Sequence, residues 1–459
     1  MRTSNPEGCG GTCDRFSSLS DEVAHEILSF LTIEEIARIS VVSKRFRRLS
    51  LSAPYLFLNF SCTKISKVGN TLLNTDRFVS LLDGTTKLRR FVLKNVFLYS
   101  EDIIQVCNWT REAAEIDLSF VMFDKDCFSL QPSTFVRAIK LRLHGGNLKL
   151  PSFTTSFSSL QVLDIKSIKL PNNLPDKWVS SLFPVIKKLI LEDVEDIKDL
   201  NISSSSLEFL SINRCTLRRV VVLAQRLQTL CVGSCNLLRY WLFKIYAPSL
   251  QNISWTANSY SFQGGFVCLK DSYHANIDAP RIKLLQFINN AKSVTVGANI
   301  LQVLLAEDLI GHSLDNVQNL DMQVSCKENY RVPALAFLFG RLHNLKTLTI
   351  RCIDRETFGC DGSKVLLALE TRDFNIDMEY WKSQDVAFIH QLKEVKIEIR
   401  KWGCEVGLVK YLIKHAKALD KMIVTFSSNI DTSIKRLICK KLLEFYKASP
   451  IATLDFVLK

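Results

Sequence analysis

The sequence predicts an α/β protein in which a short block of three helices precedes an irregular repeat array with a parallel sheet and a βαβαβ cap. Three observations support this prediction. Residues 14–60 hold three short amphipathic segments, an apolar pattern then recurs over much of the chain, and residues 392–458 alternate between strand and helix patterns. With 459 residues, of which 47% are hydrophobic, the chain is long enough for more than one folded unit.

The first helix of the block is expected to begin near Asp21, where negative charge suits the helix dipole. Its apolar residues recur every three or four positions and form one stripe: Val23, Ala24, Ile27, Leu28 and Leu31. Thr32 should cap the second helix, because Glu35 follows three residues later as in a capping box. The third helix is expected over residues 41–49, with cations crowding one face.

This block resembles the F-box, the motif by which substrate-receptor proteins dock on the Skp1 adaptor of a cullin ubiquitin ligase. The resemblance rests on Leu19-Ser20-Asp21-Glu22-Val23, on residues 27–31 and on residues 42–47. Two positions depart from the usual pattern. Ser20 stands where the family usually has proline, which pre-orders the start of a helix, although serine can cap one. Phe46 stands where plant members usually have tryptophan, and it keeps the aromatic bulk without the indole N–H.

The resemblance implies which residues would contact the adaptor. The candidates are Leu19, Ser20, Val23, Ile27, Leu28, Val42, Lys44 and Phe46. A block this small buries few side chains, so its apolar residues must divide between its own core and a partner. Ile27 and Leu28 cannot face the same way, because they are consecutive in a helix.

Behind the block, the pattern apolar-x-x-apolar-x-apolar recurs eight times. Its copies begin at Leu88, Ala113, Val136, Leu160, Ile186, Leu207, Leu227 and Leu250, which are 20 to 26 residues apart. This spacing is the period of leucine-rich repeats, and the last two apolar positions of each copy fit a short strand. Cys215 and Cys235 fall where such repeats bury asparagine or cysteine in the turn after the strand, which predicts a structural role for both.

The segments between the strands are irregular. Residues 197–206 are expected to form only a turn, so this part of the array should be a flat-backed solenoid. The pattern fades over residues 258–290 and resumes at Val317 and Leu345, with a helix expected over 332–342.

The C-terminal run predicts strands over 392–399, 419–424 and 452–458, and helices over 404–415 and after Asp431. Right-handed crossovers would place these strands in one parallel sheet that covers the end of the array. The run is similar to the FBD domain of plant F-box/leucine-rich-repeat proteins at Tyr380-Trp381, 388–395, 412–416 and 419–422. The predicted order is therefore a disordered tail (1–13), the F-box (14–60), the repeats (61–377) and an FBD-like cap (378–459).

Several classes of function are disfavoured. The formal net charge of +13 is spread thinly, which fits solvated faces or an acidic partner better than nucleic-acid binding. The 14 cysteines lack a preceding signal peptide, so we expect reduced thiols, and no ligand spacing predicts a metal or cofactor site. No catalytic motif stands out. No apolar run is long enough to cross a membrane, so the cytoplasm and/or the nucleus is expected.

The leading hypothesis is a non-catalytic substrate-recognition subunit of an SCF-type ubiquitin ligase, which would bind Skp1, and through it a cullin, and hold an unknown protein target. The target would lie on exposed strand positions, for which the candidates are Lys140, Arg142, Asp164, Lys166, Ser211, Asn213 and Cys231. The alternative is a leucine-rich-repeat interaction scaffold whose F-box no longer engages the ligase.

Overall fold

The computed structural model divides into two compact units, Met1–Pro171 and Asn172–Lys459, and each is described by itself. The described residues are 18–59, 88–98, 106, 108–111, 113–122, 127–135, 137–171, 174–175, 177–256, 258–260, 265–268, 288–297, 313–325, 331–353, 381, 386, 388–399, 404–427, 430–446 and 453–458. The predicted tail, residues 1–13, lies outside them.

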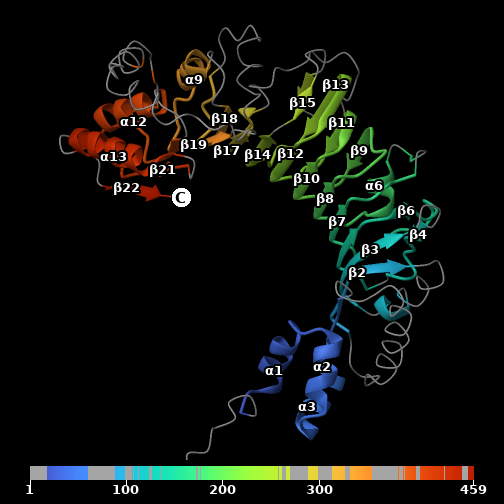
Figure 1. Cartoon of the computed structure of the whole chain (residues 1–459). Helices are drawn as coiled ribbons and strands as arrows, with labels where there is room; N and C mark the ends of the chain where they lie inside the picture. The colour runs from blue at the N-terminus through green and yellow to red at the C-terminus, as the bar shows by residue number, and fades with distance from the viewer. Residues whose placement is uncertain are drawn as a thin grey trace, which may run out of the picture. The chain divides into compact units, whose positions relative to one another are not determined.

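The N-terminal helical block consists of α1 (Asp21–Leu28), α2 (Ile33–Ser40) and α3 (Lys44–Leu51) (Figure 1). The expected capping box is present, with the Thr32 side chain accepting from the Glu35 N–H and the Glu35 carboxylate accepting from the Thr32 N–H. The third helix begins at Lys44 rather than at residue 41, because the Ser43 hydroxyl accepts from the Phe46 N–H at 3.2 Å and caps it.

The first unit continues into a parallel sheet directly after the helices. Its strands pair in the order β1 (Tyr55–Asn59), β2 (Arg90–Leu98), β3 (Glu115–Met122), β5 (Lys140–His144) and β7 (Val162–Lys166). A short pair, β4 (Cys127–Ser129) and β6 (Asn147–Lys149), lies beside it. Strand β1 falls within the range predicted as the F-box, so the sheet begins before residue 61 and is joined to the helices without a linker.

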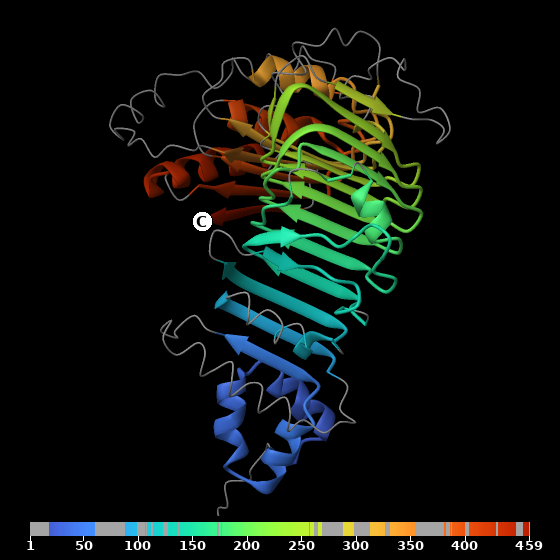
Figure 2. The ribbon, with the colours of Figure 1, turned by 90° about the vertical axis from the view of Figure 1, so that its right-hand side faces the viewer.

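The second unit carries a longer parallel sheet (Figure 2). Its repeat strands pair in the order β8 (Lys188–Glu192), β10 (Phe209–Asn213), β12 (Thr229–Gly233), β14 (Asn252–Thr256), β17 (Ser293–Val296), β18 (Asn319–Ser325) and β19 (Thr347–Ile353). Helix α6 (Trp178–Leu182) precedes β8, and α9 (Arg331–Phe339) lies in the range where a helix was expected. Strand β17 was not predicted, since its two apolar residues, Val294 and Val296, lie between the stretch where the repeat pattern fades and its resumption at Val317.

A second parallel sheet lies alongside these repeat strands. Its members are β9 (Asp199–Ser203), β11 (Thr216–Leu223), β13 (Asn236–Tyr246), β15 (Ser259–Tyr260) and β16 (Gly265–Cys268). The prediction of a mere turn over 197–206 is therefore wrong, because Leu200 and Ile202 alternate into the core as strand residues. The two sheets pack through aromatic rings, with Phe243 of β13 5.2 Å from Trp255 of β14 between centroids.

The apolar triplets face the core as predicted in seven of the eight copies, for example at Leu207, Leu210 and Ile212. The copy placed at Val136, Ile139 and Leu141 is wrong by two residues. In the structure Ala138, Leu141 and Leu143 are buried, whereas Ile139 is 45% exposed. Two overlapping triplets fit this stretch of sequence, and the pairing of β5 with β3 selects the second one.

Buried polar turns follow the strands of the second unit. The thiols of Cys215 and Cys235 each point at a carbonyl of the preceding repeat strand, Leu191 O at 3.9 Å and Ile212 O at 3.5 Å. Asn258 holds the same place one repeat later. Its Nδ2 donates to Val232 O at 3.0 Å and its Oδ1 accepts from the Cys235 N–H at 2.8 Å. The predicted structural role of both cysteines fits these contacts.

The C-terminal segment has the predicted β-α-β-α-β order. It consists of β20 (Glu394–Ile399), α12 (Cys404–His415), β21 (Lys421–Phe426), α13 (Thr432–Tyr446) and β22 (Thr453–Leu458). The strands continue the sheet beyond β19 in parallel pairing, β19 to β20 to β21 to β22. Asp431 accepts from the Ser433 N–H at 2.7 Å at the start of α13, as its predicted capping position requires.

Candidate functional site

The helical block has a small core that uses only one side of each helix. Ala24 and Leu28 of α1, Ile36 of α2 and Leu49 of α3 are buried together, with Leu31 packed against them. So few side chains leave most of the apolar residues of the block without a place in its core.

Three of the predicted docking residues are exposed apolar side chains. Val23 and Ile27 lie on the side of α1 that faces away from the core, and Val42 lies in the turn just before α3. Large apolar residues scattered singly are ordinary on a protein surface. Their concentration on one block of about forty residues is what distinguishes this surface.

The other five docking candidates have mixed surroundings. Ser20 and Lys44 are exposed, and Leu19 and Phe46 are half-buried. The prediction is wrong for Leu28, which is 1% exposed and belongs to the core. The apolar stripe of α1 is wider than the core it covers, so periodicity alone could not separate Leu28 from Ile27.

Sequence reasoning missed the two most exposed apolar residues of the block. Phe30 is 74% exposed in the turn after α1, and Val41 is 84% exposed in the turn after α2. The signal that could have found them is their place in turns, where polar residues are normally preferred. We define the docking surface as Val23, Ile27, Phe30, Val41 and Val42.

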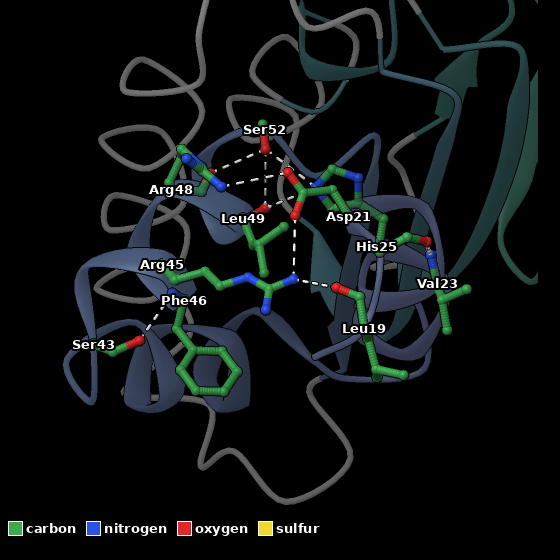
Figure 3. A network of polar contacts seen from close by, with 11 residues as sticks. Leu19, Asp21, Val23, His25, Ser43, Arg45, Phe46, Arg48, Leu49 and Ser52 are labelled. Atoms are coloured by element: carbon green, nitrogen blue, oxygen red, sulfur yellow. Dashed lines mark hydrogen bonds and ion pairs between the residues drawn. The ribbon is translucent and has the colours of Figure 1, made fainter. Parts of the chain in front are cut away.

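Polar contacts tie the start of α1 to α3 (Figure 3). The Arg45 guanidinium donates to the Leu19 carbonyl oxygen and lies 3.3 Å from Asp21 Oδ1. Asp21 Oδ2 is also 3.5 Å from Arg48 Nη2. His25 also joins the helices. Its Nε2 lies 3.2 Å from Leu49 O and 3.1 Å from Ser52 Oγ.

The charges of the block are divided between its helix starts and α3. Hydrogen bonds from its own backbone N–H and from the Ser20 hydroxyl hold the pKa of the Glu22 carboxyl below its usual value. The Thr32 N–H and hydroxyl do the same for the pKa of Glu35. In contrast, α3 exposes the cations Lys44, Arg47 and Arg48. A partner that meets this helix is therefore favoured if it is acidic.

Four of the predicted target-binding residues lie on the outward side of the first unit's sheet. Lys140 and Arg142 are on β5, and Asp164 and Lys166 are on β7; all four are half-buried. Arg142 joins two acids, with Nε 3.6 Å from Asp164 Oδ2 and Nη1 4.0 Å from Asp117 Oδ2. Lys94 Nζ of β2 lies 2.9 Å from both oxygens of Asp117. Ion pairs therefore link four neighbouring strands.

The remaining three target-binding candidates lie in the second unit. Asn213 and Cys231 are half-buried on β10 and β12, but Ser211 is 6% exposed, so its prediction as an exposed position is wrong. The reason is its neighbour, since the Asn213 amide donates to the Ser211 hydroxyl at 2.9 Å. The adjacent Gly233 leaves room for that amide, because a Cβ there would collide with Asn213 Oδ1.

Within the described ranges, no group of three or more histidine, cysteine, aspartate or glutamate residues is arranged to hold a metal ion. Over the same part of the chain, no helix is long and apolar enough to span a membrane.

Comparison with known proteins identifies the two parts of the chain. The F-box domain family matches residues 16–58. The family described as "FBD-associated F-box protein At5g56370, LRR repeats" matches residues 136–350. The putative F-box/FBD/LRR-repeat protein At4g03220 of Arabidopsis thaliana is 26% identical over 96% of this chain and 95% of its own length. The chain is similar to plant F-box/FBD/LRR-repeat proteins over nearly its whole length.

Two further relatives of this F-box/LRR protein match it over nearly the same span. The putative F-box/FBD/LRR-repeat protein At5g44960 of Arabidopsis thaliana is 24% identical over 97% of this chain and 99% of its own length. The F-box/LRR-repeat protein At5g02910 of the same plant is 24% identical over 91% of this chain and 89% of its own length. Members of this family are typically non-catalytic adaptors, and an F-box domain generally implies binding to Skp1.

Proposed function

We propose that this F-box/LRR protein is the non-catalytic substrate-recognition subunit of an SCF-type ubiquitin ligase. Its docking surface would bind a Skp1-type adaptor, and through it a cullin, while the outward faces of its sheets would hold a protein target.

The observation that carries the proposal is the docking surface. Its residues are apolar, exposed and dispensable for the core of the block. Removing a Val, Ile or Phe side chain from water contributes about 1.5–3 kcal/mol, so several together can offset the loss of translational and rotational freedom on association. The exposed cations of α3 add charge that would favour an acidic adaptor surface.

The chemistry of ubiquitin transfer would belong to other subunits. This chain would contribute proximity, because a target held on the same assembly as the ubiquitin-carrying enzyme reacts at a high effective concentration. The direct continuation of α3 into β1 supports that role. Leu56 and Leu58 of β1 are buried, and the Tyr55 hydroxyl lies 3.4 Å from Glu26 Oε2 of α1, which fastens the helices to the first strands.

For the target, the outward sheet positions named above remain candidates. Those in the first unit combine both signs of charge in cross-strand ion pairs, whereas those in the second unit are small and uncharged. Such surfaces would favour a protein or peptide target whose polar groups can form hydrogen bonds and ion pairs with these side chains.

The deciding experiment is co-purification of the full chain with a plant Skp1-type adaptor and a cullin. Ile27→Asp should abolish adaptor binding. The matched control is Ile139→Asp, because Ile139 is also an isoleucine, is 45% exposed against 41% for Ile27, and lies just before β5, outside the helical block. Full adaptor binding by Ile27→Asp would refute the docking assignment. A wild-type chain that binds no adaptor would favour the interaction-scaffold alternative.

A further inference from the structure

We propose that Arg45 is a positioning residue for adaptor docking, which together with Ser20 does the work that proline does at this position in other F-boxes. The inference rests on the proposed function, because it concerns how the start of α1 is held ready for the adaptor.

The geometry starts with the contact between α3 and the chain just before α1. The Arg45 side chain crosses to that segment, donating to the Leu19 carbonyl oxygen and lying 3.3 Å from Asp21 Oδ1 (Figure 3). The side chain is only 27% exposed, so these contacts are partly shielded from water. A cationic donor to a carbonyl or carboxylate oxygen forms a stronger hydrogen bond than a neutral donor does. Arg45 therefore contacts Leu19 and Asp21, the residues on both sides of Ser20.

The backbone of Ser20 already has the shape that proline would impose. Its φ is −65°, the value at which a pyrrolidine ring fixes the chain, and its ψ is 156°. The Ser20 hydroxyl accepts from the Val23 N–H at 3.4 Å, and its carbonyl accepts from the Ala24 N–H at 3.0 Å. Serine has no ring to lock φ, so this geometry must be held by contacts, and the Arg45 contacts flank it.

The position matters because docking residues lie on either side of it. Leu19 precedes Ser20, and the exposed Val23 follows three residues later on α1. A segment that is ordered before association does not have to be ordered during it, so the affinity for the partner rises. Arg45 thus acts through Leu19 and the first turn of α1.

Arg48 provides the matched control on the same helix. It reaches the same carboxylate, with Nη2 3.5 Å from Asp21 Oδ2, but its side chain is 68% exposed. The Arg48 guanidinium donates to Asp21 Oδ2, whereas the Leu19 carbonyl oxygen accepts from Arg45. Replacing Arg48 removes one cation from α3 but keeps the hydrogen bond from Arg45 to the Leu19 carbonyl oxygen.

The first test measures the affinity of the full chain for a purified Skp1-type adaptor at fixed ionic strength. Arg45→Gln should weaken binding about tenfold, which corresponds to about 1.4 kcal/mol. Arg48→Gln removes the same charge from α3 but leaves the contact with Leu19 in place, so it should weaken binding clearly less than Arg45→Gln does. Ser20→Pro should have little effect alone, because the ring supplies order while the serine cap is lost. In the Arg45→Gln background it should restore most of the affinity.

The second test needs no adaptor. Amide hydrogen exchange of the free chain should be faster at Val23 and Ala24 in Arg45→Gln, and unchanged at Ile36 in α2, whose N–H donates to the Thr32 carbonyl at 2.9 Å. Ser20→Pro should reverse the increase. If Arg45 positions the start of α1, the double variant Ser20→Pro, Arg45→Gln should show normal exchange there. A general loss of stability would instead raise exchange in all three helices together.

The outcomes divide clearly. Unchanged exchange at the start of α1, or uniformly faster exchange throughout the block, would overturn the positioning role of Arg45. A loss of affinity that Ser20→Pro does not restore would also overturn it, since Arg45 would then contact the adaptor itself. If the wild-type chain binds no adaptor, the proposed function fails, and the exchange measurement still decides whether Arg45 orders this segment.

Discussion

Ile27 and Leu28 are consecutive residues of α1 with opposite environments: Leu28 is 1% exposed in the core of the helical block, whereas Ile27 is 41% exposed and belongs to the proposed docking surface. The rotation of about 100° between neighbours in a helix is enough to separate them. If the docking proposal holds, substitutions one residue apart should therefore affect stability and adaptor binding separately.

Leu28→Ala should lower the stability of the helical block by about 2–4 kcal/mol, because it leaves a cavity in a core of very few side chains. Ile27→Ala should change stability by less than about 0.5 kcal/mol, as is usual at exposed positions, yet weaken adaptor binding. The exchange rates of the amides in α1 to α3 under increasing denaturant measure the change in stability. The affinity for the adaptor measures the change in binding. Equal destabilisation by the two variants would contradict the separation.

Much of the architecture could be predicted because the strand signal is local and repeated. The apolar triplets identify most repeat strands, and the Thr32–Glu35 capping box and the Asp431 cap mark helix starts by side-chain chemistry that a single sequence reveals. Cys215 and Cys235 were placed correctly for the same reason, since they follow their strands at a fixed distance.

The errors arose where tertiary pairing decides between local alternatives. At β5 two triplets overlap, and only the neighbouring strand selects the one that leaves Ile139 outside. At β9 the serine-rich composition suggested a turn, but pairing with β11 makes Asp199–Ser203 a strand. The exposure of Phe30 and Val41 depends on the size of the core, which hydrophobicity alone does not report.

The turns after four repeat strands carry a residue in the left-handed region: Ser167, Asp193, Arg214 and Ser234, with φ between 50° and 55°. Left-handed backbone costs an L-residue about 1–2 kcal/mol, and glycine in exchange loses about 0.5–1 kcal/mol of extra entropy on folding. Ser234→Gly should therefore raise stability by about 0.5–1 kcal/mol. The Ser234 N–H, which donates to Thr256 O at 2.8 Å, is kept.

Ser254→Gly, within strand β14, is the matched control for this turn substitution. Glycine inside a strand should lower stability by about 0.5–1 kcal/mol, because no left-handed strain is relieved. Denaturant midpoints of the two variants should therefore move in opposite directions. If the denaturant midpoints of both variants moved in the same direction, the left-handed conformation of Ser234 would have no measurable effect on stability.

Asp321 on β18 predicts a pH-dependent effect. Burial raises the pKa of its carboxyl above the usual value, although Arg351 and Lys396 partly oppose this. A carboxyl with a raised folded-state pKa is destabilising when charged, and this cost disappears as the pH falls through that pKa. Asp321→Asn should therefore raise stability at pH 7 and lose this advantage at acidic pH. The gain should stay below about 1 kcal/mol, because the ion pair with Arg351 offsets part of the cost of burial.

The pKa of Asp315 is shifted in the opposite direction to that of Asp321, so Asp315→Asn should have the opposite effect on stability. Hydrogen bonds from Ser313 and His343 lower the pKa of the Asp315 carboxyl, so its charged form stabilises the fold above the usual pKa. Its replacement should lower the midpoint at pH 7 and have no effect once the pH falls below the lowered pKa. Identical pH profiles for the two variants would refute both assignments.

The buried thiols should be inert in the folded protein. Burial raises the pKa of Cys215 to about 12 and that of Cys235 to about 11, and the thiolate is the form that is alkylated. Iodoacetamide at pH 8 should leave both unmodified until the chain is denatured, whereas the exposed Cys127 should react in the native state. Peptide mass spectrometry distinguishes the sites, and native modification of Cys215 or Cys235 would contradict their structural role.

Asn258 should be more costly to replace than either cysteine, because its amide satisfies two buried backbone groups. Asn258→Ala leaves the Cys235 N–H and the Val232 carbonyl without these partners, which should cost about 2–4 kcal/mol. Asn258→Cys should be intermediate, since a thiol at the same place in the preceding repeat reaches the equivalent carbonyl, Ile212 O, but cannot replace the strong acceptor Oδ1. Denaturant midpoints in the order wild type, Asn258→Cys, Asn258→Ala would support this reading. Equal losses in the two variants would mean that the acceptor alone matters and that cysteine and asparagine are not equivalent in these turns.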